Sequence, residues 1–204
     1  MNRRITALTY QQRNRNRVNI FLDGEFAFGV AQILAAWLHV GMELSEEKIS
    51  ELQSADELET AYQRALNLLS YRPRTAAEIR RKLERWGAQE HVIVNTLERL
   101  TRNGLVNDAA FSQRWIENRI ETRPRSRRAL SYELKQHGVE PEIIEKAIFK
   151  IDDNEQAYLA AKKQARKLKQ LEWKEFRQKM LRHLAQRGFD YETSSAATRK
   201  FWDE

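Results

Sequence analysis

The sequence predicts a mainly α-helical protein, an elongated tandem array of three three-helix, helix-turn-helix-like repeats, preceded by a small β-hairpin or three-stranded sheet with short helices. Three observations predict it. Alternating apolar residues stop near residue 30, helical periodicity is unbroken from Ala55 onward, and one motif recurs after 51 residues. We expect a sheet-and-helix segment and three repeats, the last degenerate, at residues 1–60, 61–107, 108–153 and 154–204.

The sheet is predicted from a hairpin signal. Val18–Leu22 alternates, and Asp23-Gly24 separates it from the run that begins at Glu25. Both central residues of a type I′ turn need positive φ, which this dipeptide tolerates. We expect a polar loop over 11–17, where Arg13, Arg15 and Arg17 could contact phosphate but are better explained as a solvated hairpin end.

Two helices are expected after the sheet. The first covers Ala31 to His39 and stops before Gly41, and Ser45 offers an N-cap for the second, which contains Ile49 and Leu52.

The repeat is read from R-P-R-[ST]-x3-[IL]-x3-L-x3-G, which fits both 72–87 and 123–138. A degenerate third copy keeps Met180, Leu184 and Gly188, while Trp173-Lys-Glu-Phe176 replaces its start. Two of only three prolines and two of seven glycines fall on the first two copies, so chance is a poor explanation.

The residues of the motif predict the structure of one repeat. Pro73 and Pro124 cannot lie inside a helix, so each ends a first helix or opens a turn. Thr75 with Glu78 forms a capping box for a second helix, whose buried stripe is the i, i+4 apolar pair. The glycine follows at a C′ position, and a third helix completes the unit. A unit of about fifty residues buries too little surface alone, so neighbours should stack into a curved array.

Composition excludes several classes of protein. The 204 residues contain no cysteine, which rules out disulfides and Cys-ligated zinc. No secretion signal or membrane span is visible, so we expect a cytoplasmic protein. We also expect a monomer. The net charge of +7 divides into −3, +5, 0 and +5 over the four segments, and it hints at nucleic acid as a partner.

Basic residues cluster in register with the repeats, at helix starts and on exposed helix sides, where they suit phosphates or an acidic protein. For each residue alone, a solvated helix face is an equal alternative; for the repeated set we favour function. The candidate binding residues are Arg72, Arg74, Arg80, Arg81, Lys82, Arg85, Arg123, Arg125, Arg127, Arg128, Lys162, Lys163, Arg166, Lys167 and Lys169.

Other constellations point away from catalysis. The four histidines share no metal-ligand spacing, and no phosphate-binding loop or nucleophile elbow is present, so we expect no cofactor, no metal and no enzyme. Asp152-Asp153 is better explained as a helix N-terminus than as a metal site. For four tryptophans we favour packing over base stacking: Trp86, Trp115, Trp173 and Trp202.

The chain resembles the RecX family of recombinase regulators. The resemblance rests on Leu69-x2-Arg72-x-Arg74-Thr75-x2-Glu78-Ile79-x3-Leu83-x3-Gly87, Leu100-x3-Gly104-Leu-Val-Asn107-Asp108-x2-Phe111, Glu133-Leu134-x3-Gly138-Val139, Phe21–Phe28 and Gly41–Leu44. The chain departs from the family at two places. Asn107-Asp108 stands where the family usually has an Asp-Asp pair, and Ser126 stands where the family often has a glycine.

The resemblance implies a non-enzymatic modulator that binds the RecA–DNA filament and inhibits its ATP hydrolysis, strand exchange and growth, in homologous recombination, DNA repair and the SOS response. The basic candidates would then contact RecA or DNA, with single- or double-stranded DNA as the secondary partner. The alternative is a helix-turn-helix transcription regulator, although the middle helices have few Asn or Gln residues to read bases.

Overall fold

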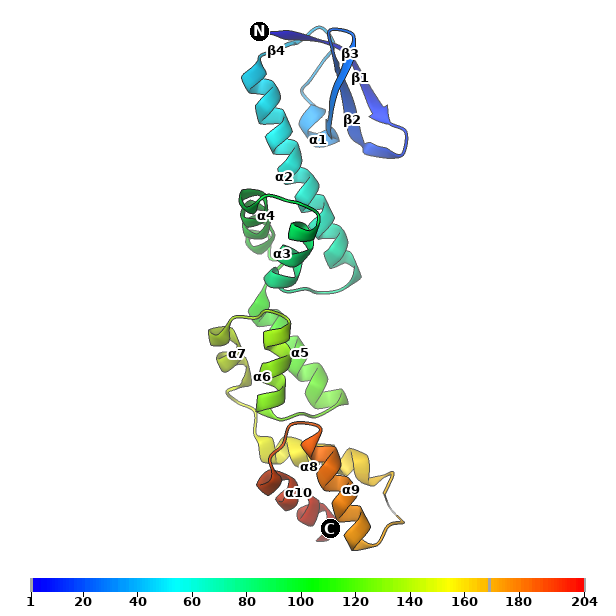
Figure 1. The fold of residues 1–204 in the computed structure, drawn as a ribbon, viewed down its shortest axis with the longest axis vertical. Coiled ribbons are helices and arrows are strands. Elements are labelled where there is room, and N and C mark those ends of the chain that lie inside the picture. The colour runs from blue at the N-terminus through cyan, green and yellow to red at the C-terminus, as the bar shows by residue number, and fades with distance from the viewer. Residues whose placement is uncertain (1, 169, 204) are drawn as a thin grey trace. The chain divides into compact units, whose positions relative to one another are not determined.

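The computed structural model describes residues 2–168 and 170–203, which contain ten helices and four strands (Figure 1). They group into two compact units. The first holds the residues up to Arg72 together with Ile79–Leu105, and the second holds Pro73–Glu78 together with the residues from Val106. No helix of the described residues is long and apolar enough to cross a membrane.

The N-terminal residues form an antiparallel sheet, so this prediction is confirmed. Strands β1 (Arg3–Gln11), β2 (Asn14–Leu22) and β3 (Glu25–Ala31) are joined by a fourth, two-residue strand, β4 (Glu43–Leu44), in the order β3-β2-β1-β4. Asp23 and Gly24 between β2 and β3 have φ of 51° and 91°, the positive values that a type I′ turn requires.

The apolar face of the sheet is buried. Val18, Ile20 and Leu22 alternate along β2 with more exposed residues and pack with Ile5 of β1 and Val30 of β3. The period-2 alternation therefore marks the core face, as the sequence indicated.

The prediction of a loop from Gln11 to Arg17 is wrong. The strands continue through most of it, leaving only residues 12 and 13 outside β1 and β2. Arg17 is half-buried, and its guanidinium pairs with Asp56 at 2.7 Å and donates to the Gly29 carbonyl at 2.9 Å. This arginine ties the sheet to the helix that follows.

The two helices expected after the sheet differ from the prediction. Helix α1 covers only Gln32–Ala35, since the Leu38 N–H bonds to the Ala35 carbonyl and turns the chain away. Helix α2 begins after Ser45, whose side chain accepts from the Lys48 N–H, as predicted. It runs unbroken over Glu46–Tyr71, so the predicted domain boundary at residue 60 falls inside it. The division into four segments stays a prediction.

Three three-helix repeats follow, and this prediction is confirmed. The first uses the end of α2 with α3 (Ala76–Arg85) and α4 (Glu90–Arg102). The others are α5 (Asp108–Thr122), α6 (Arg127–Gln136) and α7 (Pro141–Ile148), then α8 (Asp153–Ala165), α9 (Trp173–Ala185) and α10 (Tyr191–Asp203). The i, i+4 pairs of α3, α6 and α9 are all buried: Ile79 and Leu83, Leu130 and Leu134, and Met180 and Leu184.

The N-caps of the middle helices explain the motif letters. Thr75 Oγ1 accepts from the Glu78 N–H, and Ser126 Oγ accepts from the Ala129 N–H, each at 3.2 Å. In the third repeat the helix starts one turn earlier, and the equivalent position is occupied by Phe176, which is buried inside α9. In the third repeat, the residues that replace the R-P-R-[ST] start therefore form an additional first turn of α9.

The tryptophans divide into two kinds. Trp115 stacks on Phe111, and Trp173 packs with Phe176 and Trp202 at ring distances of 5.1–6.4 Å, which confirms packing for these three. Trp86 is as exposed as Trp202 (43% against 44%), but among the described residues it makes no ring–ring contact, and the Arg64 guanidinium lies 5.5 Å from its ring centroid.

Candidate basic binding surface at the joint of the second and third repeats

Consecutive repeats meet where the start of one middle helix lies against a later glycine turn. In the first joint, the start of α3 contacts the turn between α6 and α7: the Thr75 hydroxyl donates to the His137 carbonyl at 2.6 Å. In the second joint, the start of α6 contacts the turn between α9 and α10: the Ser126 N–H donates to the Arg187 carbonyl at 3.1 Å. Both joints lie within the second unit.

A carboxylate completes each joint. Asp108 Oδ1 accepts from the Ala76 N–H at 2.9 Å, and Asp153 Oδ1 accepts from the Arg127 N–H at 2.7 Å. The residue before each aspartate caps its own helix, since Asn107 accepts from Ala110 and Asp152 from Asn154. Asp152-Asp153 is thus a helix N-terminus, as expected, and Asn107 does the same capping without a charge.

Four arginines gather around the second joint. Arg119 Nε lies 2.7 Å and Arg125 Nε 3.0 Å from the carboxylate of Glu133, which also accepts from Trp115 Nε1 at 2.7 Å. Arg187 donates to the Pro124 carbonyl at 3.3 Å and to His183 Nε2 at 2.8 Å. Arg123, the C-cap residue of α5, is exposed.

The guanidinium groups at this joint lie close enough to influence one another. Burial, and then the guanidinium groups of Arg125 and Arg123, lower the pKa of Arg187. Burial, followed by the charges of Arg187 and Lys167, lowers the pKa of His183 to about 4. Glu133 is shared by Arg119 and Arg125, so the four arginines outnumber the one carboxylate that their side chains contact among the described residues. We call Arg123, Arg125 and Arg187 the second-joint arginines.

The remaining candidates of the second and third repeats are mostly exposed. Arg127 and Arg128 lie at the start of α6, and the charge of Arg128 helps, after hydrogen bonds from Thr193, to lower the pKa of Asp190. Lys163 Nζ contacts the Glu121 carbonyl at the end of α5. The candidates on and after α8 that are exposed are Lys162, Lys163, Arg166 and Lys167; the predicted Lys169 lies outside the described residues.

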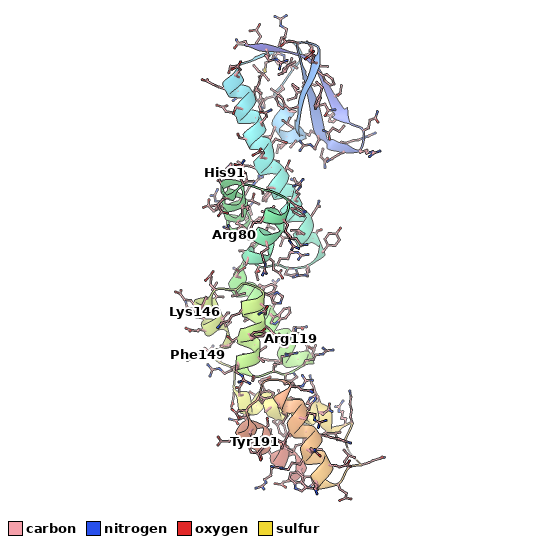
Figure 2. The ribbon with its side chains drawn as sticks, viewed as in Figure 1. Arg80, His91, Arg119, Lys146, Phe149 and Tyr191 are labelled. Atoms are coloured by element: carbon pink, nitrogen blue, oxygen red, sulfur yellow. The ribbon has the colours of Figure 1, made fainter. Side chains whose placement is uncertain are left out.

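The candidates of the first repeat are not brought together in the same way. Arg80, labelled in Figure 2, is paired with Glu90 at 2.7 Å, and Arg85 Nε donates to the Arg81 carbonyl of its own helix. Arg81 is exposed and Lys82 half-buried. Arg72 and Arg74 flank Pro73 between α2 and α3, and both have interaction partners.

Sequence reasoning missed Arg119, Arg187 and the receiving Glu133. Arg119, labelled in Figure 2, lies on α5 with its guanidinium 4.3 Å from the Trp115 ring centroid. Arg187 directly precedes Gly188, the glycine of the third motif copy. That position relative to the motif glycine was the one available signal, because the residue before a C′ glycine lies at the turn.

Comparison with known proteins finds one family along most of the chain. Four RecX family domain models match: the N-terminal domain of regulatory protein RecX over residues 3–45, and its first, second and third three-helix domains over 61–100, 107–148 and 152–198.

Curated relatives and solved structures agree. Regulatory protein RecX of Bacillus licheniformis is 33% identical over 198 residues, and that of Bacillus subtilis 32%, each alignment covering 95% of this chain and 75% of the relative. A crystal structure of regulatory protein RecX superposes with a TM-score of 0.72 at 28% identity, over 99% of this chain and 100% of that one. RecX from Lactobacillus salivarius, at 24% identity and a TM-score of 0.63, shares the fold over 74% of this chain and 99% of its own. This chain therefore belongs to the RecX family of regulatory proteins.

Proposed function

We propose that this chain is a cytoplasmic, non-enzymatic regulator that binds the RecA recombinase on DNA and inhibits ATP hydrolysis, strand exchange and filament growth. The proposal rests on family membership over the whole chain and on one observation, the second-joint arginines. Their guanidinium groups lie close together, and Glu133, which pairs with Arg125, is shared with Arg119, so an anionic partner is favoured there.

The anionic partner is a DNA phosphate or an acidic surface of the recombinase. Guanidinium groups bind phosphate and carboxylate through paired N–H donors, which suits both partners. Arg127 and Arg128 extend the positive charge along the exposed start of α6. The N-cap Ser126 and the Arg127 N–H are already engaged within the joint, so side chains rather than the helix terminus make the contact.

A sequence-specific DNA reader is less well supported. Helix-turn-helix proteins present one helix with free N-terminal residues to the base edges. In this chain the starts of α3 and α6 lie in the joints, where Thr75 is 0% and Ser126 1% exposed. The middle helices of the first two repeats therefore have their N-termini covered by the next repeat, so these two helices are not available to read bases.

Phosphate release by RecA in the presence of ATP and single-stranded DNA tests the proposal. We expect hydrolysis to fall when the protein is added at and below the RecA concentration, and the inhibition to weaken as salt is raised, because counterions compete with the arginines. Unchanged hydrolysis up to equimolar protein would refute the proposal. Tight binding to one duplex sequence over random DNA, with unchanged hydrolysis, would support a transcription regulator instead.

A further inference from the structure

The glycine turn of the first repeat lacks the contact that its two counterparts make. A Cβ built on Gly138 would lie 2.4 Å from the Cβ of Ala77, and one built on Gly188 would lie 2.6 Å from Ser126 Oγ, so each turn is covered by a helix start. At Gly87 the same test finds no atom within 4 Å. Because Gly87 and Gly138 share a φ of 78°, the two backbones match while their surroundings differ.

The uncovered turn forms one wall of a groove of about 1000 Å³ in the first unit. Trp86, Gly87 and Ala88 line it from the α3–α4 turn, Glu57 and Arg64 from α2, and the start of α1 closes the third side. In both joints the start of a preceding middle helix covers the glycine turn. The groove lies at the corresponding place beside the Gly87 turn.

The acidic half of a joint is also present. Asp56-Glu57 precede Arg72 by the same number of residues as Asn107-Asp108 precede Arg123. By this count Glu57 is the counterpart of Asp108, whereas Asp56, the counterpart of Asn107, accepts from the Ala31 N–H of the sheet segment at 2.7 Å. The sheet segment therefore contacts the acidic pair at this position but does not cover the Gly87 turn.

Two acceptors in the groove are unused. Among the described residues, no hydrogen bond reaches the Trp86 carbonyl, the counterpart of the His137 and Arg187 carbonyls, and Glu57 has no ion pair. A helix N-terminus carries partial positive charge and free N–H donors, which complement a carbonyl and a carboxylate. Exposed Trp86 beside Arg64 supplies the type of side chain that dominates binding at protein interfaces.

We propose that this groove is a docking site for the start of a helix from a partner protein, with a Ser or Thr N-cap and a small residue two positions later. The N-cap hydroxyl would donate to the Trp86 carbonyl, as Thr75 donates to His137, and the small residue would lie on Gly87, as Ala77 lies on Gly138. The inference concerns a different surface from the second-joint arginines and does not depend on RecA being the partner.

A peptide of residues 73–85 of this chain, which begins with the start of α3, is a suitable probe. Titrated into the full-length protein, it should shift the backbone amide signals of residues 86–89 in NMR spectra at concentrations up to about 1 mM, an affinity expected for a small contact. Replacing Thr75→Val in the peptide should weaken binding about 5-fold, the loss typical of an N-cap.

Protein variants locate the binding. Trp86→Ala should weaken peptide binding about 10-fold or more, whereas Trp37→Ala, at a tryptophan of similar exposure outside the groove, should change it less than about 2-fold. Because Trp86→Ala could also alter the turn, Glu57→Lys at an exposed position gives a second reading and should weaken binding about 5-fold.

Several results would overturn the proposal. These are no shifts at residues 86–89, equal binding of the unaltered peptide and its Thr75→Val variant, or equal effects of Trp86→Ala and Trp37→Ala. A single-stranded oligonucleotide that shifts the same amides where the peptide does not would assign the groove to nucleic acid and would also overturn it.

Discussion

Gly138 and Ala77 lie so close that the joint between them has no room for a side chain on the glycine. A Cβ on Gly138 would approach the Ala77 Cβ to 2.4 Å. Gly138→Ala should therefore destabilise the protein by about 2–4 kcal/mol, from strain at positive φ together with overpacking. Gly87→Ala, at the same φ of 78° but in open space, should cost only about 1 kcal/mol. Urea unfolding of the two variants measures the difference, and equal losses would show that the first joint does not constrain the glycine.

Asp108 caps a helix of the preceding repeat at a cost. Burial, the largest effect, outweighs the hydrogen bond from Ala76 and raises the pKa of its carboxyl group. Because the folded state then disfavours the charge, this group's contribution to stability falls as pH rises above 3.8, the ordinary value.

Asp108→Asn keeps an acceptor oxygen and removes the charge, so its stability at pH 7 should equal or exceed that of the unaltered protein. Asp108→Ala should lose about 1 kcal/mol, the value of an N-terminal capping interaction. Thermal unfolding of both variants at pH 7 tests this, and a larger loss for Asn than for Ala would contradict the assigned role.

His183 should make the second joint sensitive to acid. Its pKa is about 4 in the folded chain against 6.5 ordinarily, so the unfolded chain binds the proton more readily. Stability should then fall as pH drops from about 6.5 toward 4. His183→Gln should flatten this part of the profile, and NMR titration of the imidazole gives the pKa directly. A titration midpoint near 6.5 would disprove the burial argument.

Arg125 and Arg128 should respond differently to charge reversal. Arg125→Glu would place a second carboxylate where Arg125 Nε now lies 3.0 Å from Glu133, and we expect a loss of about 2–4 kcal/mol. Arg128→Glu at an exposed position should change stability by less than about 1 kcal/mol. The fluorescence of Trp115, which donates to Glu133, reports the first change. Equal melting of the two variants would mean that the Arg125 pair contributes nothing.

Much of the fold could be predicted because its signals are local. The positive φ of Asp23-Gly24, the N-caps Thr75 and Ser126, and the i, i+4 apolar pairs each depend on residues within one turn or hairpin. The family resemblance, now confirmed, added the regulatory role that these patterns could not supply.

The candidate site was harder to predict because its partners are distant in sequence. Arg187 meets the Pro124 carbonyl 63 residues away, and Asp108 caps Ala76 across 32 residues. Such pairings follow from how the repeats stack, which periodicity does not encode. Likewise, the sequence motif alone suggests that Arg125 is part of an exposed R-P-R segment, yet in the structure Arg125 pairs with Glu133.

Binding to a RecA filament on single-stranded DNA tests the central claim most directly. The informative variant is Arg123→Glu with Arg128→Glu, which removes exposed charge at the second joint and leaves the Arg125–Glu133 pair intact; Arg114→Glu, an exposed arginine outside the candidate set, is the matched control. Fluorescence anisotropy should show the double variant binding about 10-fold or more weakly, equivalent to ~1.4 kcal/mol, with a smaller salt dependence, and the control close to the unaltered protein. Equal affinity of all three proteins for the filament, or no binding by any of them, would contradict the account.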